Sequence, residues 1–130
     1  MFILSLSRGK RTKKKTVDRD KALLITSSVP AEKGFHFSTD PQKPTGNIAT
    51  SIFDFLDEVK KIDVRSIDFH SKRGDFSKWL REVIKDDALA NDFERLSSLA
   101  VTGEELRQKI VEVTEMRCKE LANELKGLAR

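Results

Sequence analysis

The stretch after Gly74 carries the clearest structural pattern in this sequence. Apolar residues recur there at spacings of i, i+3, i+4, i+7 and i+8, the period of one buried helix face. These residues are Phe76, Trp79, Leu80, Val83 and Ile84. Asp75 precedes them and is a favourable N-cap residue. The spacing predicts a helix over about 75–85 that buries this face, so the fold must be built around at least one amphipathic helix.

Apolar periodicity predicts two more helices. In residues 51–61 the acidic side chains come early and the lysines late, the order that favours the helix dipole. In residues 87–99 the helix can begin from Asp86 or Asp87 as its cap. Residues 63–72 fit either a short helix or an irregular buried segment. Their structure stays open at the level of sequence.

The last predicted helix runs from residue 102 to about residue 126. Thr102 and Glu105 form a T-x-x-E capping box at its start, and Gly127 stands where helices commonly end. Arg117 interrupts the apolar stripe of this helix. We therefore expect the last turns to be half buried or to face a partner.

A short β-hairpin is predicted ahead of the helices. Residues 22–27 and 34–39 contain β-branched or aromatic side chains, and the segment between them has a proline and a glycine that signal a turn. Residues 40–47 carry two prolines and a glycine and are expected to form a loop. The expected fold class is α+β: a basic N-terminal extension, a hairpin over about 22–39 and about four helices, in a single small domain over 22–130.

The first twenty-one residues concentrate the positive charge of the chain. They contain eight basic and two acidic side chains, whereas residues 22–130 contain 17 basic and 19 acidic ones. The basic residues are Arg8, Lys10, Arg11, Lys13, Lys14, Lys15, Arg19 and Lys21. No helical or strand period is sustained here, so we expect an extended arm. Closely spaced Lys and Arg in such an arm can follow a phosphate backbone and release its counterions, which predicts nucleic-acid binding.

Phe2 is the only aromatic residue of this arm. Base stacking is therefore poorly supported, and contact with the RNA backbone is the expected mode of binding. A solvated tail without a partner is the main alternative. A role at a membrane surface is less favoured because the arm has no amphipathic period beyond its first seven residues.

A second group of candidate residues surrounds the predicted helix start at residue 75. His70, Arg73, Asp75 and Trp79 lie close together in the sequence. They could form a small polar pocket or a surface that docks a partner. We favour a structural interpretation, in which Asp75 caps the helix, Trp79 fills the core, and His70 with Arg73 satisfies neighbouring carbonyls or carboxylates.

The sequence gives little support for enzymatic activity. It has two histidines and one cysteine, Cys118, and it lacks the spacings of common metal, phosphate-loop and nucleophile motifs. No catalytic residue, metal ligand, cofactor or small-molecule substrate is predicted. A helix-turn-helix interaction with DNA is disfavoured because Asp87, Asp92 and Glu94 would repel phosphate from the second helix. The single cysteine fits a reducing cytoplasm, and no apolar stretch is long enough for a membrane helix.

Several short motifs occur in order along the helical part of the chain. They are S-[LI]-x-F-H at 66–70, R-G-D-F-x-x-W at 73–79, D-x-x-L-A at 86–90 and G-E-x-L-R at 103–107. With these motifs, residues 48–125 resemble a family of uncharacterised small domains widespread in archaea. The resemblance implies an accessory domain, in some proteins appended to carbohydrate-active ones, with no established catalytic residues. It thus implies a fold more than an activity.

A small domain with a basic extension is similar in build to many ribosomal proteins. We therefore expect a non-enzymatic, cytoplasmic RNA-binding protein that is ribosomal or associated with the ribosome. Its arm would contact rRNA phosphates, and its domain would face solvent or neighbouring ribosomal proteins. One alternative is a protein-interaction or regulatory domain linked to carbohydrate-active proteins, and another is a chromatin-type DNA binder that uses the arm alone.

Overall fold

Residues 17–126, the part of the chain that the computed structural model describes, form an α+β fold. They contain an antiparallel hairpin of two strands and six α-helices, which confirms the expected fold class. The helices are α1 (Arg19–Ile25), α2 (Ile52–Lys61), α3 (Val64–Arg73), α4 (Asp75–Trp79), α5 (Asp87–Ser97) and α6 (Gly103–Lys126). The strands are β2 (Phe35–Asp40) and β3 (Lys43–Ala49).

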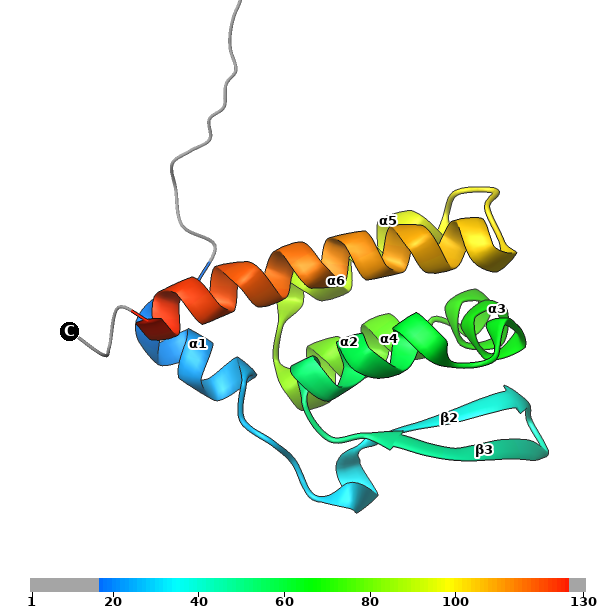
Figure 1. Ribbon diagram of the computed structural model, residues 1–130, viewed down its shortest axis with the longest axis horizontal. Helices are drawn as coiled ribbons and strands as arrows, with labels where there is room; N and C mark the ends of the chain where they lie inside the picture. Colours follow the sequence, from blue (N-terminus) through cyan, green and yellow to red (C-terminus); the bar gives the residue numbers. More distant parts are fainter. Residues whose placement is uncertain (1–16, 127–130) are drawn as a thin grey trace, which may run out of the picture.

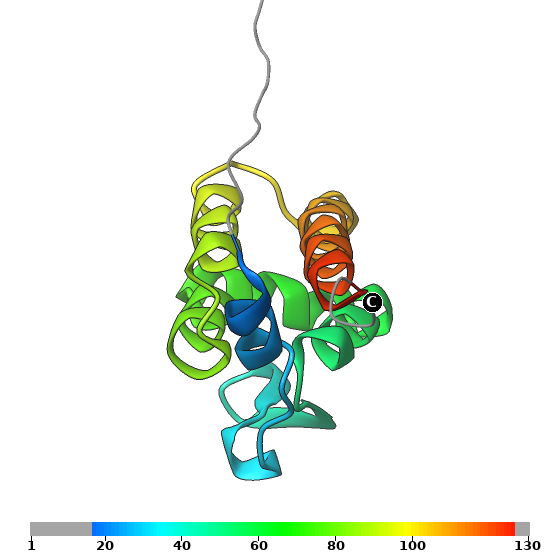
Figure 2. The same cartoon turned by 90° about the vertical axis from the view of Figure 1, so that its left-hand side faces the viewer.

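The elements are stacked in layers (Figure 1). The hairpin lies along one side of α2, α3 and α4, and the long helix α6 lies along the other. The end view in Figure 2 shows α5 and α6 as two neighbouring helices on the side away from the hairpin. The short helix α1 packs against α6. The middle layer is therefore covered on both sides, and the core lies around it.

The predicted strand at residues 22–27 is wrong, because most of this segment belongs to helix α1. Asp18 caps that helix by accepting a hydrogen bond of 2.8 Å from the Lys21 amide. Ala22 and Ile25, three residues apart, are fully buried on one face. A short apolar run fits a strand or a helix equally well, and here the cap and the burial at helical spacing decide for the helix.

The hairpin lies farther along the chain than predicted. The segment 34–39 does form a strand, β2, but its partner is β3, which occupies much of the predicted loop 40–47. Pro44 is tolerated because a two-stranded sheet has only edge strands, where one missing donor costs little. The left-handed backbone of Gly46, with φ of 88°, lies beside the irregular register. Proline and glycine thus mark an irregular strand rather than a loop.

The helical predictions mostly agree with the structure. Residues 63–72, whose structure the sequence left undecided, are almost entirely helical and belong to α3. This helix ends at Gly74, which has a left-handed φ of 75°. The helix predicted over 75–85 begins as α4 and continues as a π-helical turn at Leu80–Ile84. The turn closes when the Asp86 amide donates to the Leu80 carbonyl at 2.8 Å. Gly127, the predicted end of the last helix, lies outside the described residues.

Aromatic rings from every layer meet in the core. Phe35 and Phe37 reach it from β2, Phe55 from α2 and Phe76 from α4. The ring centroids of Phe35 and Phe37 are 4.8 Å apart, and those of Phe55 and Phe76 are 5.4 Å apart, both in edge-to-face arrangements that favour aromatic pairing. The hairpin is therefore attached to the helices through its aromatic face.

Candidate functional site

His70 lies at the junction of the hairpin with the helices. Only 5% of the residue is exposed. Its Nε2 atom accepts a hydrogen bond of 2.9 Å from the Ser38 amide in β2, and its Nδ1 atom lies 2.8 Å from Oδ2 of Asp75 at the start of α4. A backbone amide can only donate, so Nε2 must be unprotonated and Nδ1 must carry the proton. His70 is thus fixed as one neutral tautomer.

The surroundings of His70 favour the neutral ring. Burial lowers the pKa of His70 below its ordinary value, and the positive charge of Arg73 acts in the same direction, whereas the hydrogen bond and charge of Asp75 act against them. The rings of Phe35 and Phe69 lie edge-on to the imidazole, at centroid distances of 4.7 and 4.9 Å. Both ring nitrogens have partners, so His70 has no free atom to act as an acid or base.

Asp75 does not cap the helix as predicted. Gly74 is the N-cap residue of α4, and the Asp75 carboxylate is directed to other groups. Oδ2 of Asp75 accepts from Nε of Arg73 at 3.0 Å as well as from His70. Arg73 is about half exposed, and its guanidinium lies 5.0 Å from the centroid of the Phe69 ring. The carboxylate of Asp75 therefore joins α3 to α4 instead of capping the N-terminus of a helix.

Trp79 is the fourth residue of the predicted group, and it is buried as expected, with 7% of the residue exposed. Its indole N–H donates to the Lys33 carbonyl at 2.9 Å, which ties α4 to the segment before the hairpin. It also lines a hollow of about 680 Å³ between residues 28–34 and 82–85. The structure brings His70, Arg73 and Asp75 into one hydrogen-bonded group and places Trp79 in the adjoining core.

A second buried polar centre joins α5 to α6. Asp86 is fully buried and accepts from Nε and Nη2 of Arg117 at 2.8 and 3.0 Å. It also caps α5 by accepting from the Leu89 amide. Burial disfavours the charge of Arg117, but the hydrogen bonds and charge of Asp86 outweigh this effect and raise the pKa of the guanidinium. The sequence analysis did not predict this ion pair, and the interruption of an apolar stripe by Arg117 was the only signal that pointed to an unusual position.

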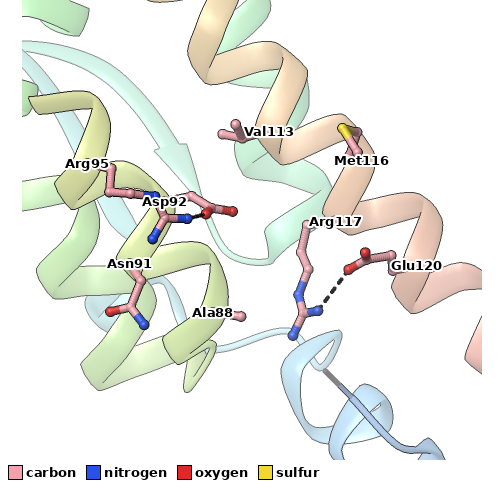
Figure 3. A pocket seen from close by; sticks show the side chains of 8 residues that line it. All are labelled: Ala88, Asn91, Asp92, Arg95, Val113, Met116, Arg117 and Glu120. Atoms are coloured by element: carbon pink, nitrogen blue, oxygen red, sulfur yellow. Dashed lines mark hydrogen bonds and ion pairs between the residues drawn. The ribbon is translucent and has the colours of Figure 1, made fainter. Parts of the chain in front are cut away.

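An open hollow of about 340 Å³ lies next to this ion pair, between α5 and α6 (Figure 3). Asp92 and Arg95 line it from α5 and form an ion pair with each other. Arg117 and Glu120 line it from α6, where Nη1 of Arg117 lies 2.9 Å from Oε1 of Glu120. Burial raises the pKa of Asp92. Met116 borders the hollow with 66% of the residue exposed. The hollow combines balanced charge with an apolar rim, so it suits contact with a protein surface better than binding of an anion.

Of the eight basic residues in the predicted arm, two lie within the described part of the chain, which begins at residue 17. The structure describes Arg19 and Lys21, which are exposed on α1, so the extended conformation predicted for them is wrong. The other six basic residues, from Arg8 to Lys15, lie outside the described residues. Val17 is buried, with 6% exposed, and belongs to the core. The packed structure therefore includes residues 17–21, which were predicted to belong to the arm.

Other chemistry has little basis in residues 17–126. Burial raises the pKa of Cys118 to about 12, which keeps this thiol protonated and unreactive. The described residues contain no cluster of three or more His, Cys, Asp or Glu side chains that could hold a metal ion. Within the same residues, no helix combines the length and apolar character needed to cross a membrane.

Comparison with known proteins connects this fold to a family. Searches of curated proteins and of solved structures found no significant match. The model of a family of unknown function, DUF5752, matches residues 15–115. These residues run from just before α1 into α6 and include His70, Asp75 and Asp86. Because the match covers more than half of the chain, the protein belongs to this family of unknown function.

Proposed function

We propose that the protein is a non-enzymatic RNA-binding protein, a component or associate of the ribosome in the cytoplasm of an archaeal-type cell. In this proposal the basic side chains between Arg8 and Lys21 bind rRNA phosphates. The observation that carries it is the partition of charge. Residues 1–16 have six basic and no acidic side chains, whereas residues 17–126 have 18 basic and 21 acidic ones. Phosphate attraction is therefore expected at one end of the chain.

The way in which α1 is held supports this proposal. Val17 is buried and Asp18 caps α1, which packs against α6. The basic stretch is thus joined to the domain at a fixed point. Arg19 and Lys21 extend the row of positive charge onto the exposed surface of α1. A phosphate backbone that follows residues 8–15 can continue along this surface.

The chemistry of the domain supports a non-enzymatic role. Both nitrogens of the buried His70 are engaged in hydrogen bonds, and the thiol of Cys118 is buried and protonated. His36 is exposed, and its Nε2 atom lies 3.0 Å from the Ala31 carbonyl. Within residues 17–126 these contacts engage both histidines and leave the thiol buried, which favours a structural role for the three side chains.

Sedimentation of cell extract through sucrose tests the proposal. We expect the full chain to travel with a ribosomal subunit at low salt and to be released at high salt, because phosphate contacts weaken as salt rises. A variant with Gln at all six basic positions between Arg8 and Lys15 should stay at the top of the gradient. Absence of the unaltered protein from every ribosomal fraction at low salt would refute the proposal.

A second candidate function is a protein-interaction or regulatory accessory domain, including one linked to carbohydrate-active proteins. The hollow between α5 and α6, with its exposed Met116, favours it. The substitution Met116→Glu separates the two candidates. If it abolished co-sedimentation while the affinity for purified RNA stayed unchanged, contact with a protein would be the main attachment.

A further inference from the structure

We propose that His70 makes the docking of the β2–β3 hairpin onto α3 and α4 sensitive to pH. The neutral ring joins three elements: it belongs to α3, accepts from the Ser38 amide of β2 and donates to Asp75 of α4. Loss of the neutral form removes the bond to the hairpin. The inference is independent of RNA binding.

The geometry at Nε2 is the basis of this sensitivity. The Ser38 amide lies 2.9 Å from Nε2 and is a fixed donor of the strand backbone. A protonated ring has N–H groups at both nitrogens, so two donors would face each other at this position. The ring and the strand then have to separate. On the other side, Nδ1–H keeps its bond to Asp75 in both states, so protonation acts selectively on the hairpin.

Groups from α3, α4 and β2 contact the ring or act on its charge. Asp75 of α4 favours the charged ring, and Arg73 of α3 opposes it while sharing Oδ2 of the same carboxylate. The strand β2 contributes the rings of Phe35 and Phe37, at centroid distances of 4.7 and 6.2 Å, together with the Ser38 amide. This strand offers the charged ring no acceptor among these contacts. A second proton on the ring is therefore unfavourable at Nε2, which faces the hairpin, whereas the contact of Nδ1 with Asp75 is compatible with the charged ring.

Protonation has a structural consequence because the hairpin covers the aromatic core. Phe35 and Phe37 are 6% and 1% exposed while β2 is docked. Detachment of the strand near Ser38 loosens these two rings from Phe55 and Phe76. Mild acid thus increases the population of an open form in which the hairpin is released and the helical layers stay packed.

Amide hydrogen exchange measured by NMR on the full-length protein tests this inference. The protection factor of the Ser38 amide should fall roughly tenfold between pH 7 and pH 5, once the pH dependence of intrinsic exchange is removed. The Leu121 amide in α6 should keep its protection. The ring carbons of His70 should titrate below the ordinary histidine pKa of about 6.5.

Two variants complete the test. In His70→Gln the pH dependence of Ser38 protection should disappear, because the amide side chain does not titrate. His36→Gln removes the exposed histidine of the same strand and should leave the dependence intact. Three outcomes would overturn the inference: unchanged Ser38 protection down to pH 5, an equal loss at Leu121, or a normal or raised pKa of His70.

Discussion

The first sixteen residues and the described domain differ sharply in charge. Residues 1–16 have six basic side chains and no acidic ones, whereas in residues 17–126 the 21 acidic side chains outnumber the 18 basic ones. Many charges of the domain are paired within it, as in Arg117 with Asp86 and Arg81 with Glu94. The proposed binding function and the stability of the fold should therefore respond to different substitutions. The predictions below test that separation.

The largest effect on stability is expected at the ion pair between α5 and α6. Substitution of Arg117 by Met leaves the carboxylate of Asp86 buried without its partner and should cost about 3–5 kcal/mol of unfolding free energy. Urea denaturation measures this loss. RNA affinity of the folded protein should not change.

The double variant Asp86→Asn, Arg117→Met sharpens this prediction. It removes both charges and keeps an oxygen that can accept from the Leu89 amide, so it should recover part of the lost stability. Lys119→Met, on the exposed surface of the same helix, is the matched control and should be nearly neutral. Equal stability of Arg117→Met and this control would show that the buried pair is not important for folding.

A shortened chain tests where the domain begins. Removal of residues 1–21 takes away the buried Val17 and the cap Asp18, and should cost about 3 kcal/mol through lost burial and capping. Removal of residues 1–15 alone should leave the stability unchanged. Thermal unfolding of the two chains, followed by circular dichroism, measures the difference. If both were as stable as the full chain, α1 would not be part of the core.

The effect of His70 on the pH dependence of stability should be smaller than the effects of these substitutions and truncations. The pKa of His70 is lowered in the folded state, so the unfolded chain binds the proton more readily. The contribution of the neutral ring is present above the unfolded pKa of about 6.5 and is lost as the pH falls toward the folded pKa. Urea denaturation at pH 7 and pH 5 should show a loss on the order of 1 kcal/mol for this residue. The same loss in His70→Gln would assign it to other groups.

The smallest effect is expected at Ser66, which is fully buried on α3. Its hydroxyl oxygen has no hydrogen-bond partner within the described structure. Replacement by Ala removes a polar group that gains nothing from burial, so the change in stability should be within about 1 kcal/mol and should favour folding. Thermal unfolding is the measurement. A clear loss of stability would reveal a role for the hydroxyl in packing or bonding.

Sequence reasoning succeeded where the signal is local. The apolar period after Gly74, and the acidic caps such as Asp86, predicted helices that the structure contains. It failed in residues 22–27, where an apolar run is too short to distinguish a strand from a helix. The strand β3 was missed because proline and glycine usually end strands, yet an edge strand tolerates them.

The polar centres were only partly predictable because their partners are distant in the sequence. His70 and Asp75 were grouped correctly, but the Ser38 amide is 32 residues away from His70 and has no sequence signature. Asp86 was recognised as a cap and Arg117 as an interruption of the apolar stripe. Nothing in their spacing of 31 residues paired them. Packing of α5 against α6 creates that contact.

The salt dependence of RNA affinity tests the central claim most directly. For the full chain, the logarithm of the association constant should fall with the logarithm of salt concentration with a slope of about −5 to −7. Gln at the six basic positions between Arg8 and Lys15 should reduce the slope to about −2, because two basic residues remain. The control carries Gln at six exposed domain lysines, namely Lys33, Lys61, Lys72, Lys78, Lys119 and Lys126. It should keep the original slope, whereas equal slopes in both variants, or no salt dependence of the full chain, would contradict the account.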